Sequence, residues 1–117
     1  MSNSIALNER QIKNHQEILF NLLDIRGTLM LVDPDSLSLD QHIAWNEQMY
    51  QVGLAIIAAE KSVLTSISKD YAKVLPKLKK STDSLERDLH KLKAASDVIA
   101  AVGSALGTIS SIITLLG

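Results

Sequence analysis

Apolar residues recur every three or four positions along almost the whole chain, and few residues interrupt that pattern. The 117-residue sequence holds only two prolines and five glycines. Spacings of three and four residues place side chains on one face of an α-helix, whereas β-sandwiches and barrels need alternating segments separated by many turn residues. Aromatic residues make up only 3% of the chain and hydrophobic residues 46%. The pattern therefore predicts an all-α fold with ample apolar material for a core.

The first periodic segment spans residues 8–32. Its main apolar stripe consists of Ile18, Leu22, Ile25 and Leu29. Asn8 followed by Gln11 is typical of a helix capping box. The Asp-Pro-Asp-Ser sequence at 33–36 is typical of a turn, because proline restricts its predecessor and donates no backbone hydrogen bond.

A second helix is expected over 38–75 or 38–80, with Ser38 and Gln41 as its capping box. Pro76 either kinks this helix or ends it. The apolar heptad line of the segment comprises Ile43, Tyr50, Ile57, Leu64 and Tyr71. The stretch 54–59 is apolar on all sides, which is typical of a helix buried inside a bundle.

A third helix is expected over 83–115. Around its start the three- and four-residue spacing of a coiled-coil seam runs through Leu75, Leu78, Thr82, Leu85, Leu89, Leu92, Ser96 and Ile99. We therefore predict a single domain over residues 1–117, an elongated bundle of three long antiparallel helices with coiled-coil-like packing. The bundle gains a fourth helix if the segment from Gly103 to Gly107 breaks the last one.

This arrangement predicts one set of buried side chains: Ile43, Tyr50, Ile57, Leu64, Leu78, Leu85 and Leu92. Truncating Ile57 or Leu85 to alanine should then destabilise the fold by about 2–5 kcal/mol.

Residues that carry catalysis are scarce. The chain has no cysteine, no Glu-x-x-His pair suited to a helical di-metal site, and no nucleophile elbow or glycine-rich phosphate loop. Glu86 and His90 are interpreted as an exposed i,i+4 pair, and His15 and His42 as solvated histidines near helix starts. The sequence predicts a protein that is not an enzyme, with no catalytic residue, cofactor, metal or small-molecule substrate.

Charge is unevenly distributed along the chain. Residues 1–68 carry a net charge of −4, whereas residues 69–93 carry +4. The main interpretation of the basic segment is a solvated helix face. Nucleic acid is disfavoured as a partner, because arginines and interleaved aromatic residues are few. The lysines that could instead contact an anionic surface are Lys73, Lys77, Lys79, Lys80, Lys91 and Lys93.

Residues 98–117 form an uncharged apolar segment of twenty residues, the length that spans a bilayer core. Gly103 and Gly107 have the small-residue spacing that lets two helices approach closely. As a helix, however, the segment separates large from polar residues, which favours docking on protein. The expected packing or interface residues are Gly103, Gly107, Leu106, Ile109 and Ile113. Gly103→Leu or Gly107→Leu should then push helices apart and destabilise the assembly.

The function expected from these features is a helical interaction module that self-associates or binds a helical protein partner through apolar faces. The alternative is a membrane-associating or pore-forming-type protein that inserts residues 98–117. Long helices with a Gly/Ser/Ala-rich apolar stretch resemble, in composition, the α-helical pore-forming toxins, although their stretch lies between helices. No secretory signal precedes the first helix, so we expect a cytoplasmic protein, with a membrane-associated or signal-less secreted form as the alternative.

Overall fold

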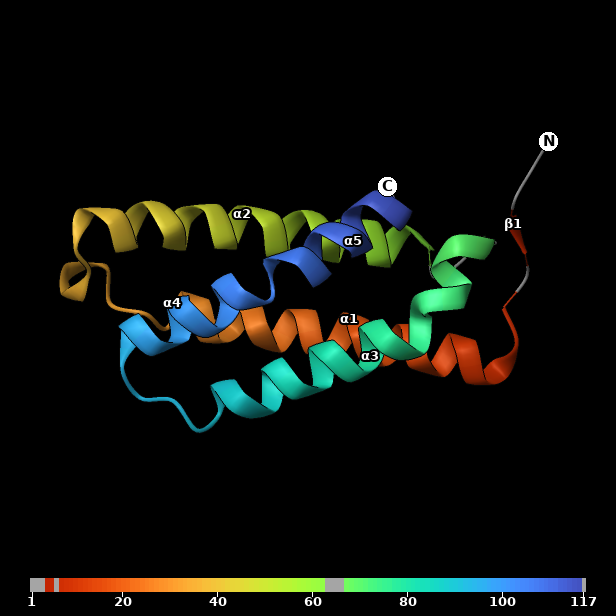
Figure 1. The fold of residues 1–117 in the computed structure, drawn as a ribbon, viewed down its shortest axis with the longest axis horizontal. Helices are drawn as coiled ribbons and strands as arrows, with labels where there is room; N and C mark the ends of the chain where they lie inside the picture. The colour runs from red at the N-terminus through yellow and green to blue at the C-terminus, as the bar shows by residue number, and fades with distance from the viewer. Residues whose placement is uncertain (1–3, 6, 63–66, 117) are drawn as a thin grey trace.

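The structure, a computed structural model, describes residues 4–5, 7–62 and 67–116 and is built almost entirely of α-helices (Figure 1). The described helices are α1 (Glu9–Met30), α2 (Leu39–Ser62), α3 (Lys69–Leu89), α4 (Ala95–Ser104) and α5 (Leu106–Leu116). A short 3-10 helix, η1 (Pro34–Ser36), joins α1 to α2, and the two-residue strands β1 (Ser4–Ile5) and β2 (Ile67–Ser68) pair antiparallel. The all-α fold class predicted from the sequence is confirmed.

The helices enclose one core along the long axis of a body that measures 49 × 26 × 19 Å. Helix α1 packs against α2 and α3, and the α4–α5 pair packs against the same two helices. Figure 1 shows α4 and α5 running back along the bundle after α3. Each helix contributes fully buried side chains, among them Leu22, Val52, Leu75, Val102 and Ile112.

Both capping boxes predicted from the sequence are present. The Asn8 side chain accepts from the Gln11 backbone N–H at 2.8 Å, and the Gln11 side chain accepts from the Asn8 N–H at 3.0 Å. Ser38 and Gln41 make the same reciprocal pair, at 3.2 and 2.9 Å. These bonds satisfy backbone donors that a helix start leaves without partners.

The prediction of three long helices is wrong in the number of helices and in their boundaries. The second helix ends at Ser62 rather than at 75 or 80, and Pro76 lies inside α3 instead of ending a helix. The sequence between 62 and 68 carried a signal for this division, because its serines and β-branched residues are weak helix formers. The third helix is likewise divided, into α3, α4 and α5.

The division at positions 90–94 has a tertiary cause. A helix continued from α3 would carry the apolar side chains of α4 and α5 away from the core, whereas the turn after Leu89 returns them to it. The break within the last helix lies at Ala105, between Gly103 and Gly107, and the helix axis bends there by 49°. The break considered for the last helix is therefore present.

The residues of the expected seam are buried along α3. All of its members within the helix are buried: Leu75, Leu78, Thr82, Leu85 and Leu89. Leu92 is half-buried, and Ser96 is exposed where the chain has left this line.

The expected burial of the α2 heptad line is wrong. Ile43, Tyr50 and Ile57 remain 60%, 61% and 53% exposed, and Leu64 lies outside the described residues. The opposite side of α2 faces the core, through Val52, Ala55, Ile56 and Ala59. Because 54–59 is apolar on all sides, the sequence pattern did not determine which side would be buried.

We expect Leu85→Ala to lower the free energy of unfolding by about 2–5 kcal/mol, because its side chain fills the core. Ile57→Ala should lower it by less than about 1 kcal/mol in the isolated chain, because more than half of the residue is already solvated. Urea titration of both variants measures the difference. Equal losses would contradict the orientation of α2.

Candidate interaction surface

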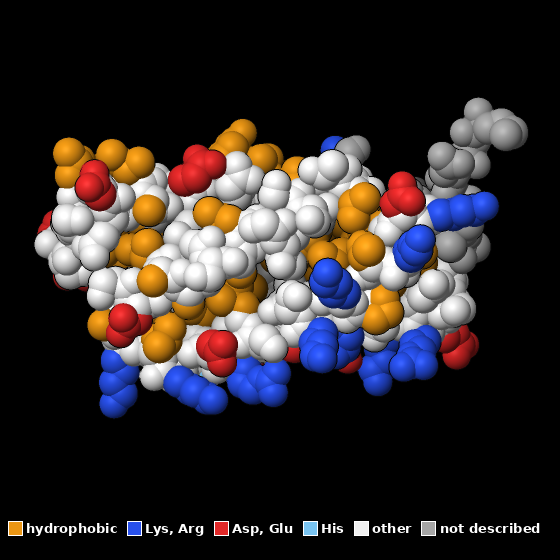
Figure 2. All heavy atoms as spheres, in the orientation of Figure 1, with side chains coloured by type: hydrophobic (Ala, Val, Ile, Leu, Met, Phe, Trp, Pro, Cys, Tyr) orange, Lys and Arg blue, Asp and Glu red, His pale blue; other side chains and the backbone are white. Residues whose placement is uncertain are grey.

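Large apolar side chains are exposed along one side of α2. We call this set the α2 outer face: Leu39, Ile43, Tyr50 and Ile57. Spacings of four and seven residues place them on the same side of the helix, opposite the buried residues. Figure 2 shows hydrophobic side chains along the edge of the molecule that α2 forms in Figure 1.

Small residues make up much of the core side of α2, beside the larger Val52 and Ile56. Ala55, Ala58 and Ala59 are buried, whereas isoleucine and tyrosine side chains point outward. The alanines allow α1 and α5 to pack closely against α2. Helices in monomers generally direct their large apolar side chains inward, so four such residues on the outer side have the character of a binding surface.

An apolar hollow of about 240 Å³ continues the outer face toward α5. Its lining consists of Leu54, Ile57, Ala58, Lys61, Ile113 and Leu116. The described end of α5 therefore extends the exposed apolar surface beyond α2 itself.

Three of the five predicted interface residues of the C-terminal segment pack in or against the core of the chain. Ile109 is fully buried, while Leu106 and Ile113 are half-buried and pack against the core. They hold α5 against its neighbours within one chain.

Among the residues that the structure describes, Gly103 and Gly107 do not make the close helix contact expected of them. A Cβ at Gly103 would meet only the side-chain Nε2 of Gln48, at an ordinary 3.5 Å, and one at Gly107 would meet nothing within 4 Å. Both glycines are exposed. A larger side chain at Gly107 therefore meets no steric obstacle in the folded chain, and the destabilisation predicted for Gly107→Leu has no steric basis there.

Among the described residues, no single helix has the length and apolar character needed to cross a membrane. The bent α4–α5 pair meets both criteria only when its two helices are taken together. In the folded chain this pair contributes five fully or nearly fully buried side chains to the core: Val98, Ile99, Val102, Ile109 and Ile112.

Five of the six lysines considered for an anionic surface are exposed: Lys73, Lys77, Lys80, Lys91 and Lys93. Lys and Arg side chains line the edge that α3 forms in Figure 2. Lys79 differs, because its Nζ lies 2.5 Å from Asp83 Oδ2 and 3.1 Å from Glu17 Oε2. Hydrogen bonds to Asp83 and then Glu17 raise the pKa of Lys79.

A polar strap joins α1 to α3 beside Lys79. Asn21 Nδ2 donates to Asp83 Oδ1 at 2.7 Å and to Thr82 Oγ1 at 3.0 Å. Burial raises the pKa of Asp83, but the bonds from Lys79 and Asn21 outweigh it, and the net pKa is lowered. These groups satisfy one another and have a structural role.

The predicted Glu86–His90 pair is present and includes a third group that sequence spacing did not indicate. His90 Nε2 lies 2.5 Å from Glu86 Oε1 and 3.4 Å from Asp24 Oδ2, on α1. Hydrogen bonds to Glu86 and then Asp24 raise the pKa of His90. The three ligand atoms lie within 4.8 Å of one another, a set that could hold a cation, but the imidazole proton already joins both carboxylates.

The interpretation of His15 as solvated is wrong. His15 is 2% exposed, its Nε2 lies 2.8 Å from the Ala59 carbonyl, and its Nδ1 lies 2.6 Å from Tyr71 Oη. A carbonyl only accepts, so Nε2 carries the proton and Nδ1 accepts from the tyrosine hydroxyl. The sequence held the signal, because His15 is three residues before Ile18 and thus on the α1 core stripe. The other histidine, His42, is half-buried and makes an edge contact with Trp45.

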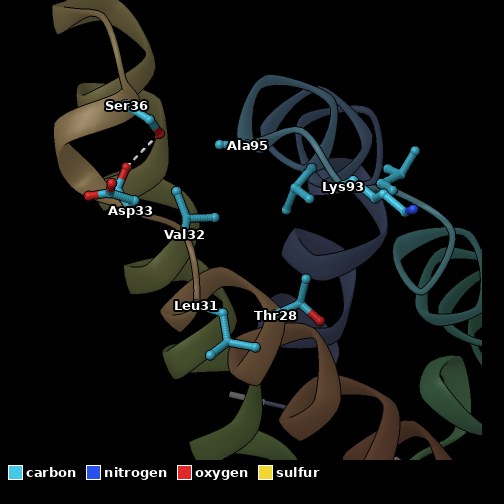
Figure 3. A pocket seen from close by; sticks show the side chains of 9 residues that line it. Thr28, Leu31, Val32, Asp33, Ser36, Lys93 and Ala95 are labelled. Carbon is cyan, nitrogen blue, oxygen red and sulfur yellow. Dashed lines mark hydrogen bonds between the residues drawn. The ribbon is translucent and has the colours of Figure 1, made fainter.

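An open hollow of about 440 Å³ lies where α1 ends, between η1 and the connection from α3 to α4 (Figure 3). In Figure 3 Ser36 donates to the Asp33 carbonyl across 2.7 Å, while Lys93 stands apart from both. Its lining brings no histidine, and no pair of carboxylates, together. The hollow therefore does not resemble an acid–base site.

No protein-family model matches the chain, and comparisons with curated proteins and with solved structures found no significant match.

The buried histidine predicts a dependence of stability on pH. Burial lowers the pKa of His15 below its ordinary value of 6.5, although the bond to the Ala59 carbonyl opposes the shift. Below pH 6.5 the unfolded chain therefore binds a proton that the folded chain resists. The free energy of unfolding consequently decreases as the pH is lowered. His90 has the opposite sign, because its raised pKa stabilises the fold at low pH.

We expect the native chain to lose stability below pH 6.5, and thermal melts of His15→Gln to lose part of that acid destabilisation. His90→Gln, the matched control on the surface, should retain that destabilisation. If His15→Gln leaves the loss of stability at low pH unchanged, the assignment of a neutral buried imidazole to His15 is contradicted.

Proposed function

We propose that this protein is a non-enzymatic helical interaction module that binds through the α2 outer face, by self-association or to a helical protein partner. The observation that carries the proposal is the exposure of four large apolar residues on one side of a helix whose other side supplies alanines to the core. A helix that lays an apolar stripe against another protein is a common mode of recognition.

The size of the outer face supports this proposal. Burying a side chain of this kind completely contributes about 1.5–3 kcal/mol. The outer face thus has the apolar centre that dominates many interfaces, and tyrosine is among the residues enriched at such centres. Exposed Asp40, Glu47 and Lys61 flank it and provide the polar rim.

The experiment is sedimentation of the full chain over the low-micromolar range, with Tyr50→Lys as the test variant and Ser110→Lys as a control at an exposed site on α5. Self-association predicts a mass above one chain that Tyr50→Lys reduces to the monomer and Ser110→Lys preserves. If the native chain is monomeric, binding of an apolar fluorescent dye reduced by Tyr50→Lys supports a face open to another partner. A monomer without such dye binding would contradict the proposal.

A second candidate function is membrane association through the α4–α5 pair, which together has the length and composition of a span. The exposed lysines of α3 provide a contact for anionic headgroups. Insertion would require the pair to leave the core, which exposes the apolar sides of α2 and α3.

Flotation with anionic vesicles tests this candidate. Ser110→Asp places a charge on the solvent side of α5, where the soluble fold tolerates it but a bilayer opposes it by about 2.5–3.5 kcal/mol. Membrane insertion predicts that the native chain and Ser110→Asn float while Ser110→Asp does not. If the native chain stays at the bottom of the gradient, this candidate is excluded.

A further inference from the structure

The α2 outer face is symmetric in its spacing. Tyr50 lies at its centre, with Ile43 seven residues before it and Ile57 seven residues after it. All three are more than half exposed. Seven residues make nearly two helical turns, so the three side chains form a straight seam of about 21 Å along the helix. Because isoleucine stands at both ends, the seam presents the same order of side chains when it is reversed.

Charge is not symmetric from one end of α2 to the other. Between positions 33 and 50 the chain carries four carboxylates and no lysine or arginine: Asp33, Asp35, Asp40 and Glu47. Between 51 and 73 the three lysines exceed the two carboxylates: Lys61, Lys69 and Lys73 against Glu60 and Asp70. All of these side chains are exposed. Figure 1 shows the start of α3 at the same end of the bundle as the end of α2. The charges of α2 itself cancel at that end, through Glu60 and Lys61, so the end becomes basic through the lysines of α3, whereas the opposite end is acidic.

From these two observations, and resting on the proposed function, we propose that the α2 outer face is covered by α2 of a second copy, packed antiparallel with Tyr50 on the two-fold axis. The reversed arrangement sets Ile43 of each copy against Ile57 of the other. It also sets the acidic end of each α2 beside the basic end of its mate, with Lys61 near Asp40. A parallel pair would place the two acidic ends together, and like charges across an interface oppose association.

The hollow beside Ile57 fits this arrangement. It lies at the basic end of the seam, between α2 and α5, and is open and apolar apart from Lys61. Two-fold symmetry brings Leu39 and Ile43 of the second copy to that end. Leu39 is 77% exposed in the single chain. Within four residues of it, the outer face holds one other apolar residue, Ile43. Each copy would fill the hollow of the other, so the contact is closed and yields a dimer.

Single cysteines test the register and the direction, because the native chain has no cysteine and supplies the background. A disulfide requires Cα atoms about 4.4–6.8 Å apart. Tyr50→Cys should therefore cross-link to itself under mild oxidation. Ile43→Cys alone should not, because the two copies of position 43 lie about 21 Å apart, but it should cross-link when mixed with Ile57→Cys. Ser111→Cys, exposed on α5, is the control for random collision.

We expect Tyr50→Cys, and the mixture of Ile43→Cys with Ile57→Cys, to cross-link at least about tenfold faster than Ser111→Cys, because pairing raises the effective thiol concentration. The mixture retains Tyr50, so it reports even if the central substitution weakens the dimer. Rapid cross-linking of Ile43→Cys to itself would establish a parallel pair and overturn the antiparallel dimer while leaving self-association intact. Cross-linking no faster than the control in every variant would overturn the inference, and sedimentation of Tyr50→Lys then decides separately whether the α2 outer face binds at all.

Discussion

The docking of the α4–α5 pair onto α2 and α3 is the contact on which the rest of the arrangement depends. Without this contact, the apolar sides of α2 and α3 that now face α4 and α5 would be exposed to solvent, because α1 does not cover them. The pair brings Val102, Ile109 and Ile112 to full or nearly full burial. Burial of apolar surface is the dominant favourable contribution to folding, so the most apolar segment of the sequence is used inside the chain.

Because the C-terminal segment is buried in the core, the exposed apolar side chains of α2 are the stronger candidate for a binding surface. A helix that contacts α1 on one flank and α4 and α5 on the other still has one side directed away from the bundle. In α2 that side carries isoleucine, leucine and tyrosine, while the core side carries three alanines together with Val52 and Ile56. Part of the surplus of apolar residues in the sequence is therefore exposed on α2. The glycines of the C-terminal segment, in contrast, make no close helix contact among the described residues.

Local signals in the sequence predicted the local features well. Asn8 with Gln11 and Ser38 with Gln41 cap the two helices they were expected to cap, and the seam from Leu75 to Leu89 is buried as its spacing indicated. Each of these features depends on residues within a few turns of one another. The apolar stripe of α1 was also identified, although His15 was not recognised as part of it because its partners, Tyr71 and Ala59, are distant in sequence.

Features that depend on tertiary packing could not be predicted in the same way. Good helix-forming residues continue past Leu89, yet the chain turns there because its apolar residues gain burial by returning along the bundle. The predicted burial of Ile43, Tyr50 and Ile57 is wrong for a related reason. Residues 54–59 are apolar on every side, and only the positions of α1 and α5 determine that Ile56 is buried and Ile57 exposed. The heptad line of Ile43, Tyr50 and Ile57 therefore indicates a shared helix side, and only the structure shows that this side is exposed.

Amide hydrogen exchange of the full chain tests most directly whether the C-terminal helices complete the core. If α4 and α5 are docked as described, the amides of residues 98–102 and 109–112 should exchange about as slowly as those at positions 22–25 of α1, because both sets open only when the shared core opens. Exchange of residues 95–116 that is orders of magnitude faster than that of α1 would contradict the account, since it would mean that these helices are not part of the core and that α2 and α3 have a second open face.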